Sequence, residues 1–221
     1  FEFGIGRSGF ARSYDVLSIP YTESQERFAE SLKIILKAWE GKEFSYHGNH
    51  YNVENAIISP APYQKPHPPL RIAANSAETF VRLGEAGHPI FVGLRGMDIP
   101  ELRENVNQYR HSWKEAGHNG EGDVSLRIPV YAGETMEQAM DEPFESIRGY
   151  FGRMGNLYRE RAGKAGLEVT ELASGRAEQI ESLSYKDMLE TKIAFGTADS
   201  LIDRFTQLKE ELGLDGVVSE L

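Results

Sequence analysis

Short apolar runs alternate with helical patterns along this chain, and this alternation restricts the possible folds more than any other feature. The apolar runs lie at residues 3–5, 70–74, 89–94, 124–132 and 216–221. Stripes of helical period lie between them, at residues 22–40, 76–86, 98–116, 184–191 and 197–212. Strands that alternate with helices form a parallel sheet joined by right-handed crossovers. The sequence therefore predicts an α/β fold.

The number of strand–helix units favours a barrel over an open sheet. We count about five units, the last without its helix, whereas a closed barrel of this type needs about eight. This count fits a (β/α)8 barrel that lacks its first units better than it fits a complete doubly wound sheet. We therefore predict one domain over residues 1–221. Residues 163–183 are polar and poorly periodic, which favours a surface insertion.

Local signals predict where several elements begin and end. Thr22 and Gln25 form a capping-box pattern for the helix at 22–40, whereas residues 9–21 look irregular. Residues 44–53 form two short runs around a Gly-Asn pair, which predicts a hairpin. Pro143 should kink or restart the helical region that begins after Thr135. The predicted buried residues of the helix at 197–212 are Leu201, Ile202, Phe205 and Leu208.

Composition excludes several classes of protein. The net charge is −10 and no basic run occurs, which argues against nucleic-acid binding. No apolar segment approaches the roughly 20 residues of a membrane span. Without a recognisable signal peptide, the default expectation is a cytoplasmic protein. There is no cysteine, and the H-x-x-H of His47 and His50 lacks a third ligand, so no metal site is predicted.

The segment LRIAANSAET at 70–79 is the strongest candidate for a binding site. An apolar strand turns directly into a helix there, and Asn75 with Glu78 matches a capping box. The first N–H groups of a helix have no intrahelical acceptor and lie at the positive end of its dipole, so they bind phosphate. The hydroxyls of Ser76 and Thr79 would add donors. The alternative is that Asn75 and Ser76 only cap their own helix.

A second strand end, at residues 3–8, favours the phosphate interpretation. Its G-x-G-x-x-G match at 4–9 is a weak dinucleotide signal, because no helical stripe follows at once. The position about 20 residues on, where the fingerprint needs an acidic residue at the end of the next strand, falls inside a predicted helix. The glycines nevertheless permit close approach of a ligand, and Arg7 offers a bidentate guanidinium for a phosphate.

The motifs FGIGRSGF, LRIAANSAET and PIFVGL, in this order, resemble the bacterial luciferase-like family of flavin-dependent monooxygenases. The stretch YTESQERFAESLKIILKAWEGKEFSYHG and the helix GTADSLIDRF extend the resemblance over essentially the whole chain. The resemblance implies a TIM barrel of which strands four to eight are present, so that the first three strands and the last helix would be missing. The family's flavin-adjacent histidine would precede residue 1, and no acid–base catalyst is assigned.

The resemblance also implies the cofactor and the residues that bind it. The cofactor is reduced FMN (FMNH2), and the residues that correspond to the family's flavin site are Gly6, Arg7, Ser8, Phe10, Ala74, Asn75, Ser76, Ala77, Thr79 and Leu94. For Phe10 and Leu94, plain core packing is the alternative. Luciferases proper carry glutamate at the position of Asn75 and cysteine at that of Gly6, so a light-emitting subunit is not expected.

The implied activity is insertion of one oxygen atom from O2 into a small organic substrate such as an aldehyde. The partners would be a flavin reductase that supplies FMNH2 and a second copy of the chain in a homodimer. One alternative is an F420-dependent oxidoreductase on the same barrel. Another is a non-catalytic flavin-binding protein.

Overall fold

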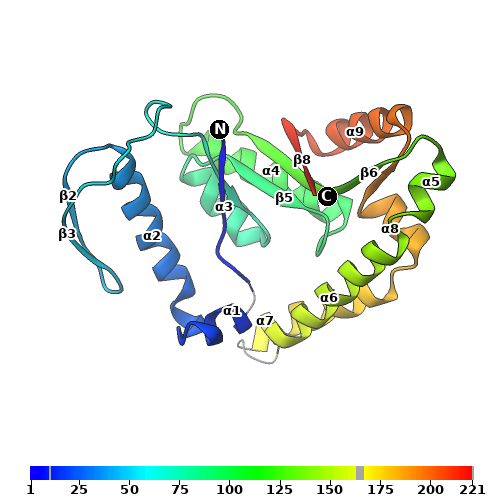
Figure 1. Ribbon diagram of the computed structural model, residues 1–221, viewed down its shortest axis with the longest axis horizontal. Helices are drawn as coiled ribbons and strands as arrows, with labels where there is room; N and C mark the ends of the chain where they lie inside the picture. Colours follow the sequence, from blue (N-terminus) through cyan, green and yellow to red (C-terminus); the bar gives the residue numbers. More distant parts are fainter. Residues whose placement is uncertain (10, 163–166, 221) are drawn as a thin grey trace. The chain divides into compact units, whose positions relative to one another are not determined.

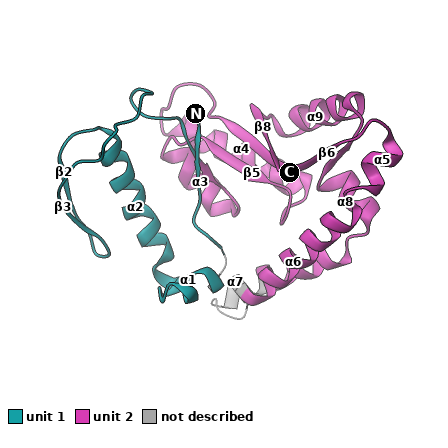
Figure 2. Cartoon of the chain, viewed as in Figure 1, with its two compact units in different colours: residues 1–71 teal, residues 72–221 magenta. Residues whose placement is uncertain are grey.

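A computed structural model describes residues 1–9, 11–162 and 167–220. The chain divides into two compact units, Phe1–Arg71 (unit 1) and Ile72–Leu221 (unit 2), coloured separately in Figure 2. Each unit is described by itself below.

Unit 1 combines one long helix with a small hairpin (Figure 1). Its elements are β1 (Phe3–Ile5), α1 (Ala11–Val16), the 3-10 turn η1 (Tyr21–Glu23), α2 (Ser24–Trp39), β2 (Phe44–His47) and β3 (Asn52–Ala56). β2 and β3 pair antiparallel, which confirms the predicted hairpin. The predicted capping box of Thr22 is wrong, because η1 holds that residue and Glu23 precedes α2 without a side-chain cap. The segment expected to be irregular contains the short helix α1.

Polar contacts and aromatic stacking stabilise unit 1. Glu30 of α2 is 8% exposed and accepts the backbone N–H groups of Asn49 (2.8 Å), His50 (3.1 Å) and Tyr51 (3.1 Å) in the hairpin turn. Trp39 packs edge-on against Phe3, with ring centroids 5.1 Å apart. The buried Glu30 carboxylate thus attaches the hairpin turn to α2, together with a hydrogen bond between His50 and Glu26 (3.0 Å) and the contact of Arg27 with the Tyr51 ring.

Unit 2 contains the parallel sheet and the helices that connect its strands. Its strands are β4 (Leu70–Ala73, which begins at the end of unit 1), β5 (Ile90–Gly93), β6 (Val124–Ala132), β7 (Ala194–Gly196) and β8 (Gly216–Glu220). Its helices are α3 (Ala77–Glu85), α4 (Ile99–Glu115), α5 (Met136–Asp141), α6 (Phe144–Ala162), α7 (Leu167–Ser182), α8 (Tyr185–Thr191) and α9 (Ala198–Leu212). The α/β prediction is confirmed, including the restart after Pro143.

The sheet of unit 2 is parallel and curled, and corresponds to part of a β/α barrel (Figure 1). β4 pairs with β5 and β5 with β6. β8 pairs with most of β6, whereas the short strand β7 pairs with the end of β6. β7 was not predicted. Because all strands run the same way, their carboxyl ends lie at one edge of the sheet, where ligands of such folds bind.

The two faces of this sheet differ in burial. Ile90, Val92, Leu126 and Ile128 are at most 2% exposed, so their side chains belong to the packed core. The residues between them along β5 and β6, such as Phe91 and Arg127, are only half-buried. One face therefore forms the helix-covered core, and the other face corresponds to the inside of a barrel.

Tyr109 of α4 joins two connections at the amino-terminal side of the sheet. Its ring is completely buried, its hydroxyl donates to the His88 carbonyl (3.0 Å), and the same hydroxyl accepts the Asp123 N–H (3.3 Å). His88 precedes β5 and Asp123 precedes β6. One side chain thus fixes where two neighbouring strands begin.

Three local predictions for unit 2 need comment. Asn75 is not the N-cap of α3; Ser76 is, and its side chain makes no cap hydrogen bond. Ile202 was expected to be buried and is 62% exposed, because the apolar side of α9 follows Leu201, Leu208 and Leu212. The expected surface insertion at 163–183 contains the regular helix α7, which lies beside α6. That this segment is an insertion stays a prediction.

Candidate functional site

The turn between β4 and α3 places hydroxyl and backbone N–H groups at the start of a helix. Asn75 and Ala77 are exposed, and Ser76 and Thr79 are half-buried. The hydroxyls of Ser76 and Thr79 lie 2.8 Å apart in a hydrogen bond. Among the described residues, the Ala77 N–H has no acceptor, as expected at a helix start. Backbone N–H and hydroxyl groups thus gather at the positive end of a nine-residue helix.

The turn after β1 carries the predicted arginine. Arg7 donates to the Ser24 hydroxyl (2.7 Å), and its guanidinium lies 5.6 Å from the ring centroid of Tyr21. Gly6 beside it is exposed and Ser8 is half-buried. Contacts within unit 1 therefore fix the position of the Arg7 side chain.

The predicted flavin residues divide between the two units. Gly6, Arg7 and Ser8 belong to unit 1, and the residues from Ala74 to Leu94 belong to unit 2. That the two groups bind one phosphate stays a prediction. Phe10 lies outside the described residues.

Two of the residues predicted to line the flavin pocket are almost completely buried. Ala74 is 4% exposed and Leu94 is 1% exposed. They continue the alternation of Ile72 and of Ile90 and Val92 respectively, which is the helix-covered side. This burial favours core packing for Leu94, and contact of either residue with a cofactor stays a prediction.

A charged cluster that sequence reasoning did not single out joins residues of β6, β8 and α6 to the segment after β5 in unit 2. Arg95 follows β5, Arg127 lies on β6 and Glu220 ends β8. Arg95 Nη2 bonds Glu220 Oε1 at 2.9 Å, and Arg127 Nη2 bonds the same oxygen. The Arg95 guanidinium lies 5.7 Å from the ring centroid of Tyr150 in α6. We call these four residues the Arg–Glu–Tyr cluster.

The loop that carries Arg95 is held from several sides. A Cβ on Gly96 would lie 2.5 Å from the Tyr158 hydroxyl of α6 and 2.8 Å from Arg176 of α7, so this glycine permits close packing. Next to it, Lys192 Nζ donates to the Met97 carbonyl at 2.7 Å. Burial lowers the pKa of Lys192, an effect that Asp98 and Glu101 oppose. The loop conformation is thus determined by contacts with α6, α7 and the end of α8.

Two polar atoms of the cluster are buried without a partner. Among the described residues, neither Glu220 Oε2 nor the Tyr150 hydroxyl has a hydrogen-bond partner. Burial raises the pKa of Tyr150 to about 12, an increase that Arg95 opposes and Glu220 favours. At neutral pH the Tyr150 hydroxyl is therefore a neutral donor.

A weak signal for this cluster is present in the sequence. Arg127 interrupts an apolar strand, Arg95 follows a strand directly, and Glu220 ends one. A charge on the inner side of a barrel strand needs a partner, which makes such positions informative. The partners themselves are distant in sequence and cannot be paired from spacing alone.

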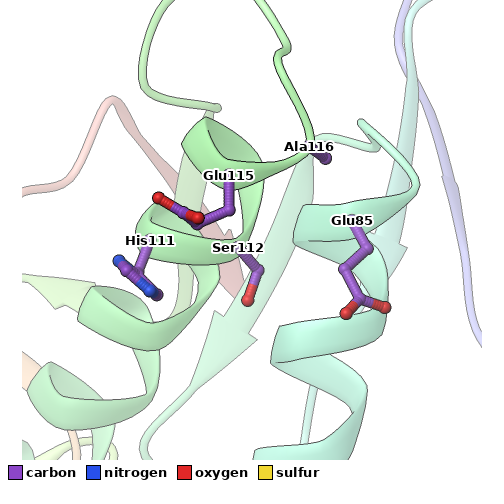
Figure 3. Close-up of a pocket in the computed structure, with 5 residues that line it drawn as sticks. All are labelled: Glu85, His111, Ser112, Glu115 and Ala116. Atoms are coloured by element: carbon purple, nitrogen blue, oxygen red, sulfur yellow. The ribbon is translucent and has the colours of Figure 1, made fainter.

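Other potential sites are less informative. A pocket of about 360 Å³ between α3 and α4 is lined by Glu85, His111, Ser112, Glu115 and Ala116 (Figure 3). It lies at the opposite end of α3 from the turn between β4 and α3. The described residues contain no group of three or more His, Asp and Glu side chains placed to hold a metal ion. In the part of the chain that the structure describes, no helix meets the length and hydropathy that a bilayer-spanning segment requires.

The curled parallel sheet and the polar groups at its strand ends define a protein of the β/α-barrel class. The profile of the luciferase-like monooxygenase family matches residues 1–216. The chain belongs to this family, whose members are oxidoreductases, so the resemblance noted in the sequence is confirmed.

Individual relatives differ in their cofactor. The FMNH(2)-dependent dimethylsulfone monooxygenase of Pseudomonas putida is 24% identical over 95% of this chain and 58% of its own length. The F420-dependent glucose-6-phosphate dehydrogenase of Kineococcus radiotolerans is 28% identical over 58% of this chain and 37% of its own length. The chain thus spans less than two thirds of these curated relatives.

A solved structure supports the fold. The oxygenating constituent of the 3,6-diketocamphane monooxygenase from the CAM plasmid of Pseudomonas putida, in complex with FMN, superimposes with a TM-score of 0.70. It is 16% identical over 99% of this chain and 64% of that chain. At this identity the similarity concerns the barrel alone, and it supports the interpretation of the sheet as part of one.

Proposed function

We propose that the protein is a monooxygenase that uses reduced FMN and O2 to insert one oxygen atom into a small organic substrate. The observation that carries the proposal is the family match over residues 1–216. The FMNH(2)-dependent relative, aligned with 95% of the chain, supports the choice of cofactor.

The residues present fit the phosphate end of such a cofactor. Ser76 is an N-cap whose hydroxyl is not used for capping and bonds Thr79 instead. Together with the helix-start N–H groups this offers donors to an oxyanion. That Arg7 binds the same phosphate stays a prediction from the sequence. The flavin ring of the bound cofactor would supply the activation of O2. The chain's part is to hold the phosphate and to provide an apolar wall that limits access of water.

The experiment is a comparison of FMN binding by wild-type protein and by Arg7→Ala, followed by flavin fluorescence. Loss of a charge-assisted contact should weaken binding by about 1.5–3 kcal/mol, or roughly tenfold to 150-fold. Ser76→Ala should also weaken binding without loss of α3, since the hydroxyl makes no cap bond. Arg12→Ala, which removes an exposed arginine of α1, is the matched control. Unchanged affinity in Arg7→Ala would remove Arg7 from the site.

An F420-dependent oxidoreductase is the second candidate, supported by the dehydrogenase relative. Binding of FMN and of F420 to the same preparation distinguishes the two. With reduced FMN, O2 and a panel of aldehydes and sulfones, an oxygenated product supports the monooxygenase. Hydrogen peroxide as the sole product supports a flavin-binding protein without turnover.

The proposal extends to the whole protein. A separate flavin reductase would supply the reduced FMN, as the FMNH(2)-dependent relative supports. We also propose a homodimer that works in the cytoplasm, which size-exclusion chromatography and cell fractionation would test.

A further inference from the structure

The pocket between α3 and α4 is separate from the residues predicted to bind flavin and has a chemistry of its own (Figure 3). It lies within unit 2, where α3 ends at Glu85 and α4 ends at Glu115. The carboxyl end of a helix is the negative end of its dipole. Two such ends therefore border one cavity of about 360 Å³, a volume within the range of sites for small organic molecules.

Two acidic side chains line this pocket without a counter-ion. Glu85 and Glu115 are exposed, and among the described residues neither carboxylate makes an ion pair or a hydrogen bond. Arg82 and Lys114, the basic residues of the two last helical turns, do not line the pocket. His111 lines it and makes no ion pair within the described part of the chain. The carboxylates and the helix ends thus favour a cation.

A hydroxyl without a partner also lines the pocket. Ser112 is 9% exposed, and its side chain makes no hydrogen bond among the described residues. Figure 3 shows this hydroxyl between the Glu85 side chain on α3 and the Glu115 side chain on α4. A largely buried polar group that lacks a partner in the protein is expected to find one in a ligand or in water. Ser112 thus offers an acceptor to a cation that faces the carboxylates.

These groups favour an organic ammonium ion over a metal ion. No three His, Asp and Glu side chains of the described residues are placed to hold a metal, so Glu85, His111 and Glu115 do not form a ligand set. A primary ammonium has three N–H donors and no acceptor. It can therefore donate to a carboxylate and to the Ser112 hydroxyl at the same time. Two carboxylates on two helices match two ammonium groups.

We propose that the pocket between α3 and α4 binds a small aliphatic diamine in its doubly protonated form. One ammonium donates to Glu85, the other donates to Glu115, and the Ser112 hydroxyl accepts an N–H from one of them. The pocket and the turn between β4 and α3 lie at opposite ends of α3, so this inference does not depend on the proposed function.

The test is an NMR titration of the ¹⁵N-labelled protein at neutral pH with three matched probes: 1,4-diaminobutane, butylamine and 1,4-butanediol. The amide signals of Ser112 and Ala116 report on the pocket. An ion pair with an exposed carboxylate changes affinity by up to about fivefold. The diamine should therefore bind about fivefold more tightly than butylamine, and the diol should leave these signals in place.

Single variants test the role of each side chain. Glu85→Gln and Glu115→Gln should each weaken diamine binding by up to about fivefold. Ser112→Ala should weaken binding of both amines without lowering the melting temperature, since the hydroxyl has no partner in the protein to lose. Glu104→Gln removes the same charge from an exposed position of α4 outside the pocket, and this matched control should bind the diamine as the wild type does.

Three outcomes would overturn the inference. Diamine binding that survives the double variant Glu85→Gln, Glu115→Gln, or that Glu104→Gln weakens equally, would show a counter-ion of the acidic surface. Equal shifts with 1,4-butanediol would show that charge is not recognised. Displacement of the diamine by MgCl2 at the same concentration would show a site for any divalent cation.

Discussion

Units 1 and 2 are built in different ways, although both belong to one family match. In unit 2, aliphatic and aromatic side chains at 0–7% exposure fill the space between the sheet and its helices. In unit 1, the described apolar core reduces to Leu70, on the strand that continues into unit 2, while the buried side chains Ser24 and Glu30 are polar. Aliphatic packing therefore predominates in unit 2, whereas hydrogen bonds to buried polar groups and aromatic contacts predominate in unit 1.

The largest expected difference between the units comes from removing a core side chain. Leu126→Ala should lower the free energy of unfolding by about 2–5 kcal/mol, because Leu126 is completely buried in β6 and leaves a cavity. Leu32→Ala in half-buried α2 should cost less than half as much. Urea unfolding followed by circular dichroism measures both. Equal costs would show that unit 1 has a core of similar quality.

A smaller effect should come from the close approach of α3 and α4 in unit 2. A Cβ on Gly84 would lie 2.4 Å from the Tyr109 carbonyl oxygen and 3.0 Å from Ser112 Cβ. Gly84→Ala should therefore destabilise by about 1–3 kcal/mol. At Gly152 in α6 nothing lies within 4 Å, so Gly152→Ala should stabilise by about 0.5–1 kcal/mol. The two thermal melting temperatures should move in opposite directions; a common direction would contradict the packing argument.

The smallest expected effect concerns the carboxylate that attaches the hairpin of unit 1. Burial raises the pKa of Glu30, but the backbone N–H groups of Asn49, His50 and Tyr51 outweigh this, and the net pKa is lowered. The ionised form is thus favoured in the folded state. Its contribution is present at neutral pH and is lost as the pH falls through the lowered pKa. Glu30→Gln should remove this pH dependence.

Amide NMR signals of residues 49–51, followed from neutral to acid pH, measure the effect. In the wild type they should shift together as Glu30 takes up its proton, and in Glu30→Gln this component of the shift should be absent. Glu43→Gln, at an exposed position, should behave as the wild type. If the amide signals of the wild type did not change at acid pH, the hydrogen bonds to Glu30 would not contribute to the stability of unit 1.

Regular elements of unit 2 could be predicted from the sequence because their periodicity is strong and local. Asp98, Thr135 and Thr197 each precede a helix of unit 2 and accept a backbone N–H three residues on. Predictions failed where several local solutions compete. Asn75 and Ser76 can each cap a helix, and the structure uses Ser76, without a side-chain bond. Ile202 shows that an apolar residue beside a stripe need not belong to it.

The candidate site was only partly predictable. The turn at Asn75 to Thr79 is encoded by neighbouring residues, so its donors were found in the sequence. The Arg–Glu–Tyr cluster joins Arg95 to Glu220 and thus depends on which strands become neighbours. Spacing along the chain contains no information on that pairing. Sheet topology had to be known first.

The hydroxyl of Tyr109 has a consequence for how this scaffold can change. Since one oxygen bonds both His88 and Asp123, the segments leading into β5 and β6 share a common anchor. Lengthening either segment by a residue would displace its backbone from that oxygen. Variation in loop length is therefore tolerated less at the amino-terminal side of the sheet than in the loops that follow the carboxyl ends of the strands. Those loops can change in sequence without displacing β5 or β6.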